Sequence, residues 1–332
     1  MKELIKKLVE TTGPSGYETA VRDLVRAEVE SLADSIRADA LGNLIARKGR
    51  KSEGGMRIML AGHMDEIGVM VTHVDENGFV RFTTLGGVGA ATCLGGRVRF
   101  INGTAGVIYG EKLESPDKVY TFEQLFIDVG AASKADCPVK VGDVAAFDRP
   151  FVDLGDRLVS KAMDDRISVA VMIETLRQIK QTPHELVFVF TTQEEVGIRG
   201  ATSAAYAVDP DLGISVDVTR SGDTPKGVRM DVSLGKGPAI KVRDSGMLSD
   251  PRLVRCMVET AEKNAIPYQL EVLEGGTTDA RAMQLARAGV PSGCLSIPCR
   301  YIHSPSEMVD YRDVQNAVRL LAALLSSPIK LE

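Results

Sequence analysis

The chain has 332 residues, 44% of them hydrophobic and 26% charged, with a formal net charge of −5 at pH 7. This composition is typical of an ordinary soluble globular protein with one large domain or two moderate ones. Basic residues do not cluster beyond a short run at residues 47–51, which we interpret as a solvated loop, so a nucleic-acid partner is not expected.

The N-terminal segment predicts a helix and not a targeting signal. Leu4, Ile5, Leu8 and Val9 recur with helical spacing, and the long apolar stretch of a secretory signal is missing. No apolar run approaches the roughly 18 residues that a membrane-spanning helix needs. We therefore expect a cytoplasmic protein with no membrane partner.

The five cysteines are odd in number, widely spaced and without a CxxC pair. A disulfide framework is therefore not expected in a cytoplasmic chain of this size, and cysteine ligation of zinc has no support. We expect these residues to act as small, buried apolar side chains. They are Cys93, Cys137, Cys256, Cys294 and Cys299.

The first 67 residues predict the start of an α/β domain. A turn with the sequence GPSGYE at residues 13–18 precedes an amphipathic helix expected at residues 19–32. A short apolar strand at residues 57–61 runs directly into the sequence GHMD at residues 62–65. A buried strand that delivers polar side chains at its carboxyl end is a common way to build an active site in an open α/β sheet.

The character of the sequence changes between residues 68 and 156. Glycine and β-branched residues dominate in short alternating runs, for example at residues 95–101 and 103–108, and turn signals recur about every ten residues. Helical periodicity is weak there. We interpret residues 68–156 as an inserted small β-barrel domain.

After residue 156 the chain returns to alternating helices and strands. Helices are expected at residues 167–179, 252–264, 279–288 and 311–325, and buried strands at residues 184–192 and 213–218. The predicted fold is α/β, with a mixed central sheet flanked by helices. Residues 1–67 and 157–332 form this domain, and the barrel interrupts it.

His63 and Asp65 are the first candidates for a metal site. Zinc-type ions favour imidazole and carboxylate ligands, and a catalytic site leaves one position open for water. Side chains two residues apart on a strand share a face, so Asp65 would hydrogen-bond the far ring nitrogen of His63 and fix its tautomer. Alone this motif is weak, because unrelated HxD pairs occur on surfaces and in cores.

The sequence KAMDDR at residues 161–166 precedes a predicted helix. Its aspartates suit helix capping as well as metal binding. In the functional interpretation, Asp164 bridges two metal ions while Asp165 or Arg166 holds the local geometry. The sequence alone leaves both interpretations open.

The sequence TTQEEVG at residues 191–197 is more specific. Two adjacent glutamates follow a strand of apolar and β-branched residues, where a charged pair is unfavourable unless it is paired or bound to metal. Adjacent side chains diverge in an extended segment, so Glu195 can bind metal while Glu194 takes a proton from water. A solvated loop start is the simpler alternative.

Asp217 and His303 complete the candidate set. Asp217 lies inside an apolar strand, where an unpaired carboxylate needs either a metal ion or an arginine. Most candidates sit at predicted strand ends, which converge on one edge of an open sheet. The predicted ligands of two divalent ions, about 3.5–4 Å apart, are His63, Asp164, Glu195, Asp217 and His303. Glu194 is the predicted general base, and Asp65 supports His63.

The order of these motifs resembles that of the TET-type aminopeptidases, which are related to glutamyl and deblocking aminopeptidases among the dinuclear metal-dependent exopeptidases. The matching segments are GPSG at residues 13–16, GHMDE at 62–66, KAMDDR at 161–166, QEEVG at 193–197, VD at 216–217, GGTTDA at 275–280 and IHS at 302–304. The resemblance covers essentially the whole chain, and the ordered set is specific although each motif alone is not.

The resemblance implies a metal-dependent aminopeptidase that acts on peptide substrates. It implies His63 on one ion, His303 on the other, Asp164 between them, Glu195 or Asp217 on either side, and Glu194 as general base. It also implies a barrel that serves dimerisation and homo-oligomers in which dimers form a hollow dodecameric tetrahedron. Zinc or cobalt is the expected metal, and manganese also suits the nitrogen and oxygen donors.

Two other enzyme classes remain as alternatives. A metallo-carboxypeptidase or deacylase would use a similar site together with an arginine for the substrate carboxylate. Some relatives are labelled as cellulases, but no paired acids for glycoside hydrolysis are evident outside the metal set. We therefore expect an aminopeptidase.

Overall fold

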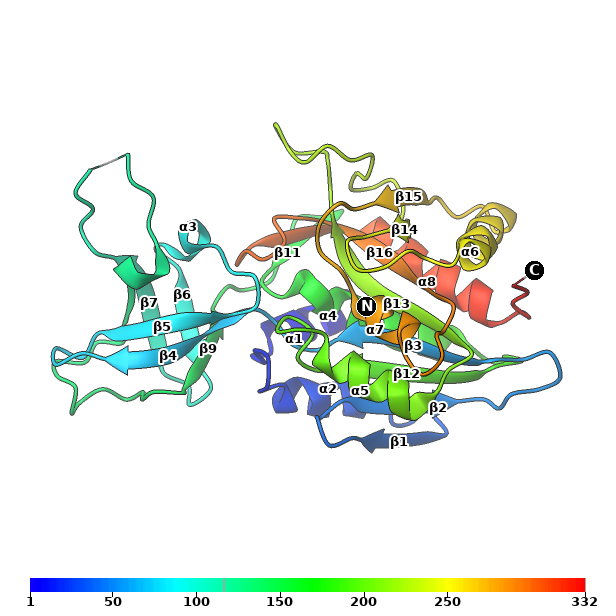
Figure 1. Ribbon diagram of the computed structural model, residues 1–332, viewed down its shortest axis with the longest axis horizontal. Helices are drawn as coiled ribbons and strands as arrows, with labels where there is room; N and C mark the ends of the chain where they lie inside the picture. The colour runs from blue at the N-terminus through cyan, green and yellow to red at the C-terminus, as the bar shows by residue number, and fades with distance from the viewer. Residues whose placement is uncertain (116, 332) are drawn as a thin grey trace.

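The computed structural model describes residues 1–115 and 117–331 and shows two bodies (Figure 1). A large mixed β-sheet with helices on both faces forms one body, and a closed β-barrel forms the other. The barrel extends from one end of the α/β body, where the chain both enters and leaves it. The predicted mixed α/β fold with an inserted small barrel is therefore confirmed.

The centre of the large sheet is parallel. β3 (Arg57–His63) lies between β12 (Glu185–Thr191) and β13 (Leu212–Arg220), and β16 (Ser292–Arg300) follows β13 in the same direction. These strands are almost entirely buried and mostly apolar, as strands covered on both faces require. Their carboxyl ends meet at one edge of the sheet.

Mostly antiparallel margins extend this centre in both directions, although β14 and β15 pair in parallel. The sheet order is β1-β2-β12-β3-β13-β16-β17-β11-β10, with β14 and β15 beside β16. The marginal strands are β1 (Ser35–Ala38), β2 (Leu44–Lys48), β10 (Val152–Asp153), β11 (Arg157–Ser160), β14 (Ala239–Arg243), β15 (Gln269–Val272) and β17 (Glu307–Asp310). β10 pairs with β11, so the chain has rejoined the large sheet at β10.

Two groups of helices cover the two faces of the sheet. One group shares the larger apolar core and comprises α1 (Lys2–Glu10), α2 (Thr19–Val29), α4 (Met163–Gln178), α6 (Pro251–Lys263) and α8 (Tyr311–Leu325). The other group, α5 (Arg199–Val208) and α7 (Asp279–Gln284), packs on the opposite face. Successive side chains of β3 point to opposite faces of the sheet. Ile58 and Leu60 pack in the larger core with the first group of helices, and Met59 and Ala61 pack on the other face with α5 and α7.

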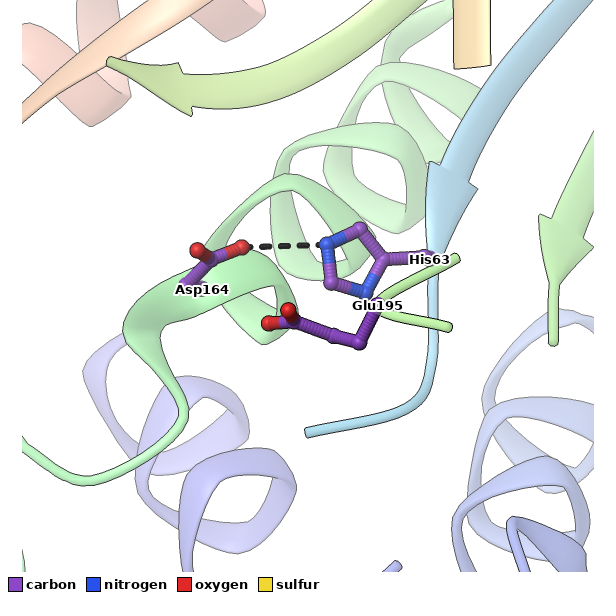
Figure 2. A group of neighbouring side chains, drawn as sticks. All are labelled: His63, Asp164 and Glu195. Carbon is purple, nitrogen blue, oxygen red and sulfur yellow. Dashed lines mark hydrogen bonds and ion pairs between the residues drawn. The ribbon is translucent and has the colours of Figure 1, made fainter. Parts of the chain in front are cut away.

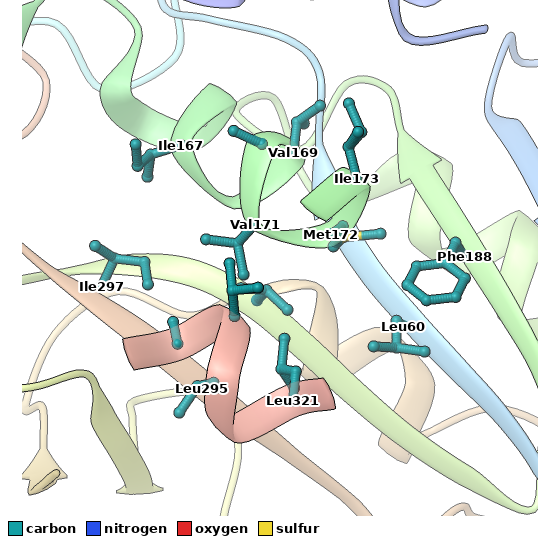
Figure 3. Packing of buried hydrophobic residues seen from close by; sticks show 14 of the residues in the cluster. Leu60, Ile167, Val169, Val171, Met172, Ile173, Phe188, Leu295, Ile297 and Leu321 are labelled. Carbon is teal, nitrogen blue, oxygen red and sulfur yellow. The ribbon is translucent and has the colours of Figure 1, made fainter. Parts of the chain in front are cut away.

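α4 runs through the larger core and fixes the position of Asp164 at its start. The helix is buried along most of its length and contacts α1, α8, β3 and β13. Figure 3 shows Met172 of this helix close to Leu60 and Phe188 of the sheet. A helix that is apolar on nearly all sides must be enclosed in this way. Its first residues are consequently held against the edge of the sheet.

The inserted body is a closed barrel with an apolar core of its own. Its strands are β4 (Gly68–Val74), β5 (Val80–Leu85), β6 (Arg97–Phe100), β7 (Ala105–Gly110), β8 (Leu125–Asp128) and β9 (Val144–Phe147), joined in part by the short helices α3 (Ala90–Cys93) and η1 (Phe122–Gln124). The strand order around the barrel is β4-β5-β8-β7-β6-β9. Alternate residues point inward: in β7, Ile108 is buried while Val107 and Tyr109 are exposed.

Several details differ from the sequence-based expectation. α2 ends at Val29, three residues earlier than predicted. α7 ends at Gln284, four residues earlier than predicted, and Arg287 beyond it has a left-handed φ of 53° that a helix cannot accommodate. All five cysteines are free thiols, but Cys137 and Cys256 are only partly buried.

Every helix within residues 1–115 and 117–331 is too short or too polar to cross a membrane.

Candidate active site

Three neighbouring strands deliver four of the candidate side chains to one edge of the sheet. His63 is the last residue of β3, Glu194 and Glu195 lie in the turn just after β12, and Asp217 lies near the carboxyl end of β13. Because these strands are parallel neighbours, their ends bring the side chains together. The predicted convergence therefore has a simple topological cause.

Asp164 lies between two histidines from opposite ends of the sequence. Its Oδ1 is 3.0 Å from Nε2 of His63, and its Oδ2 is 3.3 Å from Nε2 of His303 in the loop after β16. Oε2 of Glu195 is 3.2 Å from the same His303 nitrogen, and Oε2 of Glu194 is 3.9 Å from Nε2 of His63. Figure 2 shows Asp164 and Glu195 beside the imidazole ring of His63. A carboxylate that faces one imidazole with each oxygen suits a bridging role.

Two groups of side chains at this point have the spacing of ligands. The ligand atoms of His63, Asp164 and Glu195 lie within 4.8 Å of one another, and so do those of His63, Asp165 and Asp217. Asp165 is outside the predicted ligand set, and its Oδ2 accepts a hydrogen bond from the His63 amide at 3.2 Å. His303 belongs to neither group, although it contacts Asp164 and Glu195.

Burial disfavours ionisation of several carboxylates of the site, but not of Asp164: burial opposes its charge too, yet hydrogen bonds to His303 and His63 lower its pKa. Burial raises the pKa of Glu194 well above its usual value, the positive charge of His63 opposes this rise, and the charge of Asp217 adds to it. Burial also raises the pKa of Asp165 and of Asp217. Among the described residues, Oε1 of Glu195 and Oδ1 of Asp165 are buried without a hydrogen-bond donor. Divalent ions would satisfy these oxygens, so the donor set fits zinc, cobalt or manganese.

Both histidines occupy positions that favour a cation. Burial disfavours a charge on His63, but hydrogen bonds to Asp164 and Asp65 raise its pKa well above the usual value. Burial likewise opposes a charge on His303, and hydrogen bonds to Asp164 and Glu195 nevertheless raise its pKa to about 11. A metal ion can replace the proton at each ring nitrogen.

Asp65 supports both His63 and the turn that carries the two glutamates. Its fully buried carboxylate accepts hydrogen bonds from the amides of Glu194 at 3.0 Å and Glu195 at 3.2 Å. β3 ends at His63, so Asp65 does not share a strand face with it as expected. Nδ1 of His63 lies 3.1 Å from the Asp65 carbonyl oxygen and 3.4 Å from Oδ1.

Glu307 holds two of the candidate ligands, and the sequence analysis missed it. Its Oε2 accepts a hydrogen bond from the amide of Asp164 at 2.9 Å, and its Oε1 accepts one from the amide of His303 at 2.8 Å. Glu307 is 1% exposed. An acidic residue four positions after His303 is the one signal in the sequence that could have indicated it.

The candidate residues line a pocket of ≈ 410 Å³, within the range of small-molecule sites. Arg220, Lys241 and Arg281 also line it. Lys241 is buried, and its Nζ lies 3.1 Å from Oε1 of Glu271. The sequence analysis did not identify these cations, because the segments that carry them reach the pocket only through the tertiary fold.

Comparisons with known proteins identify a matching family. A model of the M42 glutamyl aminopeptidase family matches residues 42–320. The chain belongs to this family. The lysyl aminopeptidase of Pyrococcus furiosus is 38% identical to this M42 chain over 97% of its length and 96% of the relative's length.

Solved structures of archaeal peptidases have the same fold as the M42 chain. An aminopeptidase from Desulfurococcus kamchatkensis has a TM-score of 0.94 at 42% identity, covering 98% of this chain and 94% of that one. The TET1 peptidase of Pyrococcus horikoshii, which can assemble into a tetrahedron or a large octahedral shell, has a TM-score of 0.88 at 34% identity, covering 98% of both chains. The resemblance to TET-type aminopeptidases is confirmed, and this M42 protein is a hydrolase that acts on peptide bonds.

Proposed function

We propose that this M42 aminopeptidase removes N-terminal residues from peptides with two divalent metal ions and Glu194 as general base. The position of Asp164 carries the proposal. Its two carboxylate oxygens lie 3.0 and 3.3 Å from ring nitrogens of His63 and His303. A carboxylate shared in this way suits two neighbouring ions.

The five proposed ligands form two sets around Asp164. His63 and Asp217 would hold one ion, and Glu195 and His303 would hold the other. Zinc or cobalt is the expected metal, and manganese also suits these donors. Bound divalent ions would polarise the scissile carbonyl group and lower the pKa of an attacking water.

Glu194 is the proposed general base. Its side chain is 13% exposed and borders the pocket, so it is accessible to substrate. Burial raises its pKa well above the usual carboxylate value, which makes its ionised form a stronger base. Glu194 would accept a proton from water as the water attacks the carbonyl carbon, and would then donate a proton to the leaving amine.

The proposal extends to assembly. We expect residues 68–156 to form a dimerisation domain and the dimers to build a hollow dodecamer, as the assembly of the Pyrococcus horikoshii relative suggests. The barrel exposes Val107 and Tyr109 side by side on one face of β7, with exposures of 44% and 59%. Sedimentation velocity tests this proposal: the wild type should sediment as a dodecamer and Tyr109→Glu as a smaller species. A monomeric wild type would refute it.

Substrate panels on metal-stripped protein test the activity. Zinc, cobalt and manganese would be restored in turn, and cleavage would be followed on free-amine peptides, N-acylated peptides and cellulose. The proposal expects metal-dependent release of N-terminal residues from free-amine peptides alone. Preference for N-acylated peptides would favour a carboxypeptidase or deacylase, and release of reducing sugar would favour a glycosidase.

A further inference from the structure

The segment GPSGYE, residues 13–18, contacts the active-site turn, but the mechanism above gives it no role. Ser15 and Glu18 are polar, yet only 5% and 6% exposed. Tyr17 between them is 42% exposed. Buried polar side chains need hydrogen-bond partners, and both of these find partners beside the proposed base.

Ser15 reaches the turn through Asp65. Its Oγ donates a hydrogen bond of 2.6 Å to Oδ2 of Asp65. The same oxygen accepts from the amide of Glu195, and Oδ1 of Asp65 accepts from the amide of Glu194. The hydroxyl group therefore helps to fix the Asp65 carboxylate, which binds the backbone of both glutamates.

Glu18 holds the turn directly. Its Oε1 accepts hydrogen bonds from the amide of Gln193 at 3.1 Å and from the amide of Gly16 at 2.7 Å. Gln193 has a φ of 55°, in the left-handed region that is unfavourable for residues other than glycine. The hydrogen bond to Glu18 stabilises this conformation, which sets the direction of the chain into Glu194.

The segment is itself anchored in the core. The amide of Gly13 donates to Oε1 of Glu66 at 2.9 Å, and its carbonyl oxygen accepts from the amide of Glu66 at 3.2 Å and from Nη2 of Arg166 at 3.1 Å. A Cβ atom on Gly13 would lie 2.7 Å from a methyl group of Val21, so a larger residue does not fit without displacement. A segment fixed in this way can hold the turn in place.

We propose that residues 13–18 form a positioning clamp for the turn at residues 193–195, with Ser15 acting through Asp65 and Glu18 acting on Gln193. This inference rests on the proposed function, because the clamp orients Glu194 and Glu195 without touching substrate or metal. Displacement of a reacting group by about 1 Å can lower turnover by about 100-fold.

Hydrogen exchange tests the clamp independently of activity. Ser15→Ala and Glu18→Ala remove the two contacts, Glu18→Gln retains the oxygen that accepts both amides, and Tyr17→Ala is the matched control. The clamp predicts faster exchange of the amides of residues 193–195 in both alanine variants, and wild-type exchange in Glu18→Gln and Tyr17→Ala. Unchanged exchange in the alanine variants would overturn it.

Kinetics on a peptide substrate test what the clamp does. We expect kcat, measured at saturating metal, to fall by about 10- to 100-fold in Ser15→Ala and Glu18→Ala, with KM unchanged and with near-complete rescue in Glu18→Gln. A loss of kcat that follows a loss of thermal stability and is not rescued in Glu18→Gln would show a merely structural role and overturn the proposal. A wild type that cleaves no peptide would refute the proposed function, while the exchange result would still decide whether the clamp exists.

Discussion

Replacement of Glu307 by glutamine should weaken metal binding although no ligand is removed. The two carboxylate oxygens of Glu307 accept hydrogen bonds from the amides of Asp164 and His303, at 2.9 and 2.8 Å. Glutamine offers one oxygen and one NH₂ group, so one amide would face a donor instead of an acceptor. Two proposed ligands would then be held less firmly.

The expected loss of metal affinity in Glu307→Gln follows from the hydrogen bonds that the carboxylate of Glu307 accepts. A lost hydrogen bond to a charged group destabilises by about 1.5–3 kcal/mol. Burial and then the charge of Asp164 raise the pKa of Glu307, so removing its charge also relieves repulsion. We therefore expect the lower part of the range, about 1.5–2 kcal/mol. This corresponds to a loss of metal affinity of about 10- to 30-fold, since about 1.4 kcal/mol is a factor of ten.

Titration of metal-stripped protein with zinc in competition with a chromogenic chelator measures this affinity. Glu111→Gln is the matched control, because Glu111 lies outside the site and has a side-chain exposure of 50%. The control should bind zinc like the wild type. Wild-type affinity in Glu307→Gln would refute the role assigned to this residue.

Three further predictions concern the base, the protons and the core. Glu194→Gln should keep its metal and lose about 100- to 10,000-fold in kcat; strong residual turnover at full metal content would assign the base elsewhere. Burial opposes a charge on His63 and His303, yet hydrogen bonds to acids raise the pKa of both, so metal binding at neutral pH should release protons and affinity should rise with pH. Calorimetry in buffers of different ionisation enthalpy counts these protons, and binding without proton release would contradict the ligand assignment. Phe188 is fully buried, so Phe188→Ala should lower the free energy of unfolding by about 3–5 kcal/mol. Val119 is 77% exposed, so Val119→Ala should change this free energy by less than about 0.5 kcal/mol. Equal effects of the two substitutions in denaturant unfolding would contradict the packing described.

Regular periodicity made some elements predictable from the sequence. α8 has the predicted bounds, because its apolar residues recur at helical spacing and the side chain of Asp310 caps its first turn. The strands that carry His63 and Asp217 were also expected from their apolar residues. Local patterns are sufficient where an element packs one continuous apolar face or is wholly buried.

Elements with mixed local signals were missed. β16 contains Gly293 and Pro298, which are unusual in a central strand. The structure accommodates Pro298 because β14 pairs with β16 only at residues 294–296. α5 contains Gly200 and buries mainly alanine, so its apolar pattern is weak. In both cases tertiary packing overrides the local preference.

The strand order explains how much of the candidate site could be predicted. His63 ends a buried strand, Glu194 follows one and Asp217 lies near the carboxyl end of another, so their convergence could be expected. The contacts of Asp165 and Glu307 depend on the path of α4 and of the loop before β17, which no sequence pattern specifies. The domain boundaries, the identity of the metal, the cytoplasmic location and the dodecamer stay predictions.

Anomalous diffraction from crystals of the zinc-loaded protein tests the central claim most directly. The account predicts two zinc peaks in the same pocket, one at His63 and Asp217 and one at Glu195 and His303, with Asp164 in contact with both. A single peak, or peaks bound by other side chains, would contradict it.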